Sequence, residues 1–138
     1  MQTTDPSFLL LVAEDDADDA WLLEMALRKA CPDWACHIVP DGAALLNYVA
    51  QNASQPASLI LLDINMPRLD GIETLKRLKN DPNWYITPVV GYSTSNDQNT
   101  TESFLRKGGL HFFVKPPSYD DLVEMAAQLR RFAAVPAS

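Results

Sequence analysis

The sequence has few cysteines, and it lacks both a long apolar run and a recognisable leader. Its two cysteines, Cys31 and Cys36, are too few for a disulfide framework, and their spacing is not the C-x-x-C of redox and zinc sites. No apolar run approaches the roughly 20 residues that a membrane-spanning helix needs. The first residues lack the basic and apolar regions of a signal peptide. We therefore expect a cytoplasmic protein with reduced thiols and no membrane partner.

Positive charge and histidine are also scarce. The 138 residues carry 11 Lys and Arg against 18 Asp and Glu, a formal net charge of −7 at pH 7. Affinity for nucleic acid comes from clustered Lys and Arg, so this acidic chain is not expected to bind DNA or RNA. The only two histidines, His37 and His111, fall in strand-like segments and are interpreted as structural or surface residues. No histidine is therefore available for a catalytic triad.

The length favours one domain, and we expect it to span residues 1–138 with a core at about residues 7–133. Short apolar runs alternate with segments of helical period. The predicted strands are residues 8–13, 35–39, 58–62, 88–92 and 110–114. The predicted helices are residues 16–31, 41–49, 70–79, 96–107 and 118–132. Five apolar strands joined by helices indicate an α/β fold, in which helices cover both faces of a parallel sheet.

Two helix starts carry a recognisable signal. Asp16 is a predicted N-cap, because acidic residues follow it where the helix dipole favours negative charge. Ser118 with Asp121 resembles a capping box before the last helix. Pro32 ends the first helix, since proline cannot continue a helix.

Polar side chains follow four of the strands, at the edge of the sheet where open α/β folds bind ligands. They are Glu14, Asp15 and Asp16 after the first strand, Asp63 after the third, Ser93 and Thr94 after the fourth, and Lys115 after the fifth. Neighbouring strands lie about 5 Å apart, so these side chains can converge. Two carboxylates 4 Å apart repel by about 4 kcal/mol at an effective dielectric of 20. Protonation or a divalent cation such as Mg²⁺ or Mn²⁺ would offset that repulsion.

This set of groups suits phosphoryl transfer. A carboxylate can accept a phosphoryl group as an acyl phosphate, and the transfer needs positioning and neutralisation of charge. A cation, the Lys115 ammonium and the Ser93 hydroxyl with a backbone N–H would each hold one phosphoryl oxygen. Taken singly, each residue has a plainer interpretation as a cap, a loop residue or a surface lysine. Their occurrence together at four strand ends favours a site.

With these motifs in place, the chain resembles the response-regulator receiver family over about residues 7–133. The segment FLLLVAEDD at residues 8–16 is similar to the first strand and acidic pair of that family. The segment LILLDINMPRLDG at residues 59–71 is similar to the region around its phosphoacceptor. Residues 89–95 and 112–116 resemble its fourth and fifth strands, with Ser93 and Lys115 in place.

The resemblance implies a flavodoxin-like, doubly wound five-stranded parallel sheet with strand order 2-1-3-4-5. It implies phosphorylation of Asp63 and a Mg²⁺ or Mn²⁺ ion bound by four residues. These ligands would be the side chains of Asp15 and Asp63, Glu14 through water, and the backbone carbonyl of Asn65. The residues of the catalytic and switch machinery would be Lys115, Ser93, Thr94 and Phe112. A cis bond between Lys115 and Pro116 is also implied.

For partners, the resemblance implies a sensor histidine kinase as phosphodonor, of the phytochrome-like or hybrid kind, and a downstream protein that the sequence does not identify. The predicted helix and strand at residues 96–107 and 110–114, with the last helix, would change shape on phosphorylation. No output domain is expected after Phe132, so a partner protein would read this face, and a homodimer could form through it. Such a chain assists its own phosphorylation and is not a turnover enzyme.

Three positions depart from the family pattern. Ser93 stands where threonine is commoner, Phe112 where tyrosine is frequent, and Gly91 where an aliphatic residue is usual.

Three other functions remain open. An unphosphorylated adaptor of the same fold is the main alternative. A haloacid-dehalogenase-type phosphatase would need an aspartate at the position of Asn65. A flavodoxin-like cofactor module would need a phosphate-binding loop where Glu14 and its acidic neighbours would repel phosphate.

Overall fold

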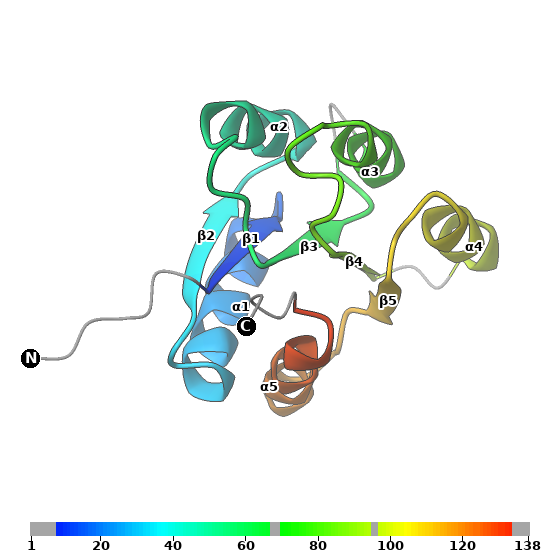
Figure 1. Cartoon of the computed structure of the whole chain (residues 1–138). Coiled ribbons are helices and arrows are strands. Elements are labelled where there is room, and N and C mark those ends of the chain that lie inside the picture. Colours follow the sequence, from blue (N-terminus) through cyan, green and yellow to red (C-terminus); the bar gives the residue numbers. More distant parts are fainter. Residues whose placement is uncertain (1–7, 67–69, 95–96, 134–138) are drawn as a thin grey trace, which may run out of the picture.

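The computed structural model describes residues 8–66, 70–94 and 97–133. Five parallel strands form one sheet in the order β2-β1-β3-β4-β5, with helices on both faces (Figure 1). The strands are β1 (Leu9–Ala13), β2 (Ala35–Val39), β3 (Leu59–Asp63), β4 (Val89–Ser93) and β5 (His111–Val114). The helices are α1 (Ala17–Ala30), α2 (Gly42–Gln51), α3 (Gly71–Lys79), α4 (Gln98–Arg106), α5 (Tyr119–Gln128) and the short 3₁₀ turn η1 (Leu129–Arg131). The predicted fold class and strand order are confirmed.

The central strands are buried from end to end, which explains their unbroken apolar sequences. All five residues of β3 and of β4 are buried, and so are four of the five in β1. Strands between two helical layers meet water on neither face, so both faces select apolar residues. The edge strands β2 and β5 are more exposed. The register pairs Asp63 with Tyr92, so the polar ends of β3 and β4 lie side by side.

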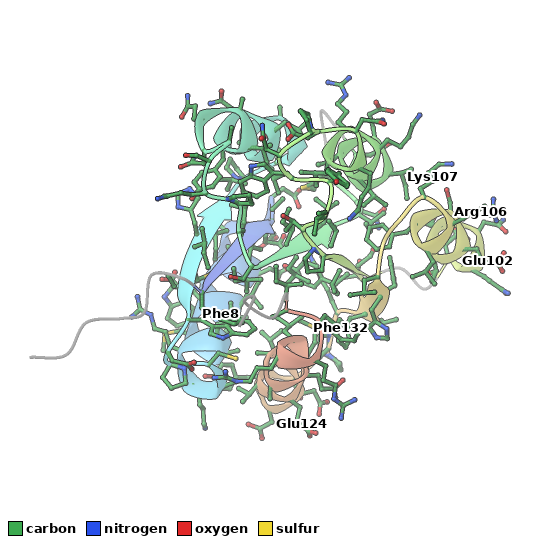
Figure 2. The ribbon with its side chains drawn as sticks, viewed as in Figure 1. Phe8, Glu102, Arg106, Lys107, Glu124 and Phe132 are labelled. Atoms are coloured by element: carbon green, nitrogen blue, oxygen red, sulfur yellow. The ribbon has the colours of Figure 1, made fainter. Side chains whose placement is uncertain are left out.

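Two layers of side chains hold the helices to the sheet. Helices α2, α3 and α4 cover one face, and α1 and α5 cover the other (Figure 1). Alternate residues of β1 enter the two layers, because successive side chains of a strand point to opposite faces. Leu11 contributes to the layer under α2 and α3, whereas Leu10 contributes to the layer under α1 and α5. The charged side chains of Glu102 and Arg106 in α4, and of Lys107 just after it, project away from the sheet (Figure 2).

A polar side chain caps the amino end of every α-helix that the described residues form. The caps are Asp16, Asp41, Asp70, Asp97 and Ser118. Each accepts a hydrogen bond from a backbone N–H of the first turn, which would otherwise lack a partner inside the helix. The predicted caps at Asp16 and Ser118 are confirmed. Each of these five helices follows a strand of the parallel sheet, so all five caps lie on loops that leave the carboxyl edge of the sheet.

Gly91, which the sequence left unexplained, makes room for the ring of Phe104. A β-carbon on Gly91 would lie 2.9 Å from Cζ of Phe104 and 3.1 Å from Cδ1 of Ile64. Gly109, just before β5, faces the same ring, where a β-carbon would lie 2.1 Å from Cε2. Phe104 is completely buried as a result. The two glycines therefore let α4 pack its one large aromatic side chain directly on the backbone.

Three structural predictions need comment. The last predicted helix does not continue to Phe132, because α5 ends at Gln128 and the chain tightens into η1, as helix ends often do. The predicted cis bond before Pro116 was wrong, since none of the described peptide bonds is cis, and trans is the form that most X–Pro bonds adopt. The predicted first residue of the fourth helix, Asn96, lies outside the described residues. Within the described ranges, no helix has the length and apolar character needed to cross a bilayer.

Candidate functional site

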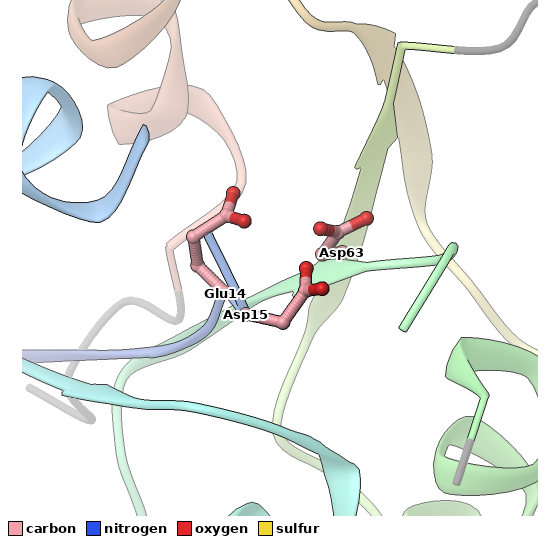
Figure 3. A group of neighbouring side chains, drawn as sticks. All are labelled: Glu14, Asp15 and Asp63. Atoms are coloured by element: carbon pink, nitrogen blue, oxygen red, sulfur yellow. The ribbon is translucent and has the colours of Figure 1, made fainter. Parts of the chain in front are cut away.

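The polar strand ends meet at the carboxyl edge of the sheet. Glu14 and Asp15 follow β1, Asp63 is the last residue of β3, Ser93 is the last residue of β4, and Lys115 follows β5. Figure 3 shows the three carboxylates beside one another, although they come from two strand ends. The order β1-β3-β4-β5 in the sheet places all four ends in a row. Residues that are far apart in the sequence thus share one small volume.

Three carboxylates of this group are close enough to bind one cation. Glu14, Asp15 and Asp63 each offer an oxygen atom, and these oxygens lie within 4.8 Å of one another. Glu14 and Asp63 are buried, whereas Asp15 is exposed and faces solvent. A donor set made only of oxygens suits a hard divalent cation such as Mg²⁺. The residues present therefore fit the metal site that the sequence predicted.

The ammonium group of Lys115 lies among the carboxylates. Its Nζ is 2.9 Å from Oε1 of Glu14, 3.2 Å from Oδ2 of Asp63 and 3.4 Å from Oδ2 of Asp19. Burial alone would lower the pKa of Lys115, but the hydrogen bonds and charges of Glu14 and Asp63 outweigh it and raise that pKa above its ordinary value. Lys115 is therefore a permanent cation at neutral pH.

The surroundings of Asp63 raise the pKa of its carboxyl group above the ordinary value. Burial raises the pKa of Asp63 to about 7, and the charge of Glu14 adds to this effect, while Lys115 opposes it. The backbone N–H of Asn65 donates to Oδ1 of Asp63 at 3.1 Å. One carboxylate oxygen thus faces Asn65 and the other faces Lys115. A divalent cation would favour the ionised, nucleophilic form.

Tyr92 is a site residue that the sequence reasoning missed. Its hydroxyl group donates a hydrogen bond to Oε1 of Glu14, and its ring centroid lies 4.8 Å from Nζ of Lys115. Burial, with the nearby charge of Glu14, raises the pKa of the Tyr92 hydroxyl, so this group stays a donor. A signal was present in the sequence, because a tyrosine in an otherwise apolar strand requires a partner for its hydroxyl. Asp19 of α1, which contacts Lys115, was missed as well.

Ser93 and Asn65 link the ends of β3 and β4. The side-chain amide of Asn65 donates to the hydroxyl oxygen of Ser93 at 2.7 Å. Ser93 is buried, whereas Asn65 and Thr94 are exposed. The predicted residues Ser93 and Asn65 therefore lie at the acidic cluster. Thr94 lies at its rim and lines a cavity there with Lys115.

Phe112 is the one predicted site residue that lies apart from the cluster. Its backbone pairs with Gly91, and its half-buried ring meets the ring of Phe104 edge-on, with centroids 5.9 Å apart. Phe112 therefore belongs to the layer beneath α4. The two histidines are also elsewhere: His111 is the first residue of β5 and stacks on Phe132, and His37 lies against Tyr48.

A cavity of about 340 Å³ opens beside the acidic cluster. Its lining includes Lys115, Tyr92 and Asp19 together with Leu22 and Tyr119. It lies between α1 and the start of α5. Polar and apolar side chains therefore share this opening beside Lys115.

Comparison with known proteins places this geometry in a family. The profile of the response regulator receiver domain matches residues 10–127. The regulator Rcp1 from Synechocystis sp. is 28% identical, and the alignment covers 94% of this chain and 90% of Rcp1. The structure of Mn²⁺-bound Rcp1 has a TM-score of 0.80 and covers 94% of this chain and 99% of that one.

Two further structures have the same fold along almost their full length. The phosphorylated cyanobacterial phytochrome response regulator RcpA is 28% identical, with a TM-score of 0.83 and coverage of 95% and 96% of the two chains. The red-light response regulator RPA3017 of R. palustris is 30% identical, with a TM-score of 0.81 and the same coverage. The predicted resemblance to regulators associated with phytochromes is confirmed.

Proposed function

The chain belongs to the response regulator receiver domain family, and on that premise we propose that Asp63 accepts a phosphoryl group from a sensor histidine kinase. The observation that carries the proposal is the position of Lys115. Its ammonium lies 3.2 Å from one oxygen of a buried aspartate and 2.9 Å from a second buried carboxylate. A cation so placed can neutralise charge on a phosphoryl group entering at Asp63.

The proposed chemistry is one displacement at phosphorus. An oxygen of Asp63 attacks the phosphoryl group of a phosphohistidine, the phosphorus–nitrogen bond breaks, and the imidazole leaves with the electron pair and takes up a proton. The product is an acyl phosphate on Asp63. Lys115 holds one phosphoryl oxygen, and the hydroxyl of Ser93 holds another. Ser93 lies at the end of β4, which pairs with the strand of Asp63, and Lys115 follows β5, the next strand in the sheet.

We propose Mg²⁺ or Mn²⁺ as the cofactor of this step. Asp15 and Asp63 would bind it directly, Glu14 through water and Asn65 through its backbone carbonyl. The ion would supply positive charge that neutralises the phosphoryl oxygens. The convergence of three carboxylate oxygens supports this assignment, and the similar protein Rcp1 has been crystallised with Mn²⁺.

The kinase is proposed to dock on the side of the site formed by α1 and the start of α5. The apolar side chains of Trp21, Leu22 and Met25 are exposed on α1, and Tyr119 is exposed nearby on α5. Leu22 and Tyr119 line the cavity that leads to Lys115. Exposed apolar side chains beside a reactive site mark a surface that another protein covers. The likeness to RcpA favours a phytochrome-type sensor kinase as the donor.

The output is proposed to leave through α4, β5 and α5. Phosphorylation adds about −1.5 to −2 charges at Asp63 and pulls Ser93 and Lys115 toward the new group. These residues belong to the ends of β4 and β5, so their displacement shifts the population of conformations in the adjoining face. Leu105, Leu110 and Val114 expose apolar surface there to a downstream protein or a second copy. Thr94 and Phe112 are proposed to move with this transition.

Intact-protein mass spectrometry tests the proposal. Acetyl phosphate is added with and without Mg²⁺ to the wild type, to Asp63→Asn and to a matched control, Asp120→Asn, which removes an exposed carboxylate of α5. We expect a Mg²⁺-dependent gain of about 80 Da, one phosphoryl group, in the wild type and the control and no gain in Asp63→Asn. A wild type that gained nothing from acetyl phosphate or from its phosphorylated kinase would instead be an unphosphorylated adaptor.

A further inference from the structure

We infer that Tyr92 is a positioning residue of the phosphorylation site. Its hydroxyl keeps a hydrogen bond to the buried Glu14 carboxylate while the ammonium of Lys115 interacts with the phosphoryl group on Asp63. This inference rests on the proposed function and adds a residue to it. Tyr92 is the next-to-last residue of β4, and its backbone pairs with Asp63 on one side and with Phe113 on the other. The tyrosine is therefore fixed by both neighbouring strands.

Glu14 needs more than one partner, because its side chain has no exposed surface. Three groups contact it. The backbone N–H of Asp16 donates to Oε2 at 3.0 Å, while Lys115 and the hydroxyl of Tyr92 share Oε1. A buried carboxylate that loses its partners is strongly destabilising. If a change draws Lys115 away from Glu14, the remaining partners must therefore stabilise the buried carboxylate.

Phosphorylation is such a change. Lys115 is shared among Glu14, Asp63 and Asp19, and the new group on Asp63 carries more negative charge than any one of these carboxylates. The ammonium is drawn toward the phosphoryl oxygens and away from Glu14. The hydroxyl of Tyr92 cannot follow, because β4 and its neighbours hold the ring in place. It remains as the side-chain donor to Glu14.

The ring of Tyr92 has a second effect on Lys115. Nζ lies 4.8 Å from the ring centroid, within the range in which an aromatic face attracts a cation. This attraction does not depend on the carboxylates and supports the ammonium in the position that the structure shows. Phenylalanine would keep the ring and the packing and would remove only the hydroxyl. The substitution Tyr92→Phe therefore isolates the bond to Glu14 from the role of the ring in the core.

The test compares Tyr92→Phe with Tyr85→Phe, which makes the same change at an exposed tyrosine outside the site. Two quantities are measured for each full-length variant. One is the rate constant for phosphorylation by acetyl phosphate at saturating Mg²⁺. The other is the dissociation constant of beryllium trifluoride, a phosphoryl mimic, determined by calorimetry with Mg²⁺. We expect Tyr92→Phe to reduce both the rate and the affinity about tenfold, as for loss of a hydrogen bond to a buried charge. Tyr85→Phe should stay within about twofold of the wild type.

A double-mutant cycle separates positioning from general packing. In a Glu14→Met background no side-chain oxygen is left to accept the hydrogen bond of Tyr92, so Tyr92→Phe should lower neither quantity further. An equal loss in both backgrounds would overturn the inference, and so would a Tyr92→Phe protein that matches Tyr85→Phe. A wild type that binds the mimic with this dependence on Tyr92 but never gains a phosphoryl group would contradict the proposed function and leave the role of Tyr92 intact.

Discussion

The ring of Phe104 lies directly against the backbone of Gly91, and this contact ties helix α4 to strand β4. A β-carbon on Gly91 would come within 3.0 Å of two atoms of the ring. Ser93 ends the same strand two residues later, at the acidic cluster. One short, fully buried strand therefore connects the proposed switch hydroxyl to the helix that would report its movement.

We expect Gly91→Ala to destabilise the protein by about 2 kcal/mol, because the added methyl group has no space beside a fixed aromatic ring. Urea unfolding followed by tryptophan fluorescence measures the effect. Phe104→Leu removes the clashing atoms, so the double variant should lose clearly less than the sum of the two single losses. Additive losses would show that Gly91 matters for another reason.

Asp63 should make the metal-free protein less stable as the pH rises. Burial and the charge of Glu14 raise the pKa of Asp63 in the folded chain to about 7, from 3.8. Between about pH 4 and pH 7 the folded chain binds more protons than the unfolded chain, so the free energy of unfolding falls as the pH increases. In EDTA, Asp63→Asn should therefore gain about 3 kcal/mol relative to the wild type between pH 4 and pH 8. Parallel pH profiles of the two proteins would contradict this.

Lys115→Met should destabilise the metal-free protein by about 2 kcal/mol. The ammonium neutralises Glu14 and Asp63, and methionine keeps the apolar stem while leaving both buried carboxylates without a cation. Saturating Mg²⁺ should restore most of the loss. Thermal unfolding with and without Mg²⁺ measures both effects, with Lys107→Met on the surface as the control. A loss that Mg²⁺ does not reduce would argue against a shared site.

The same variant tests the coupling of the switch. If Lys115 transmits the signal, Lys115→Met should lose most of the conformational response in α4 and β5 even when Asp63 carries beryllium trifluoride. Amide chemical shifts of residues 98–106 and 111–114 report that response. A full response without the ammonium would remove Lys115 from the transmission.

Ser93→Ala should separate phosphorylation from output. The hydroxyl of Ser93 accepts from Asn65 at 2.7 Å, whereas the Asp63 carboxylate accepts from the backbone N–H of Asn65 and from Lys115, so we expect the phosphorylation rate to change less than about threefold. The chemical-shift response of α4 should fall by at least about half, because β4 loses its contact with the phosphoryl group. Ser54→Ala, in an exposed loop, is the matched control. An unchanged response would place the coupling elsewhere.

Most of the fold could be predicted because each element carries its own signal. The unbroken apolar runs of β3 and β4, the acidic N-cap of α1 and the alternation of strands with helices indicate a covered parallel sheet directly. The convergence of Glu14, Asp63 and Lys115 follows from the same rule, since parallel strands end at one edge. These inferences need only local pattern and topology.

What the sequence did not reveal depends on the distances between side chains. The role of Gly91 became clear only from the position of Phe104, which lies on another element. Tyr92 was interpreted as a strand residue because its partner, Glu14, is 78 residues away. The contact of Asp19 with Lys115 likewise joins α1 to the end of β5. Tertiary contacts of this kind have no periodicity that a sequence pattern can show.

The long separations at the site have a consequence for which copies of the protein can signal. Tyr92 and Glu14 are 78 residues apart, and Lys115 and Asp63 are 52 apart. Contacts of such separation form only after long loops have closed, so they arise together in folding. A nascent or misfolded chain has Asp63 but no cation beside it. Under the proposed function, only a correctly folded copy can therefore be phosphorylated at Asp63. Misfolded copies would not signal.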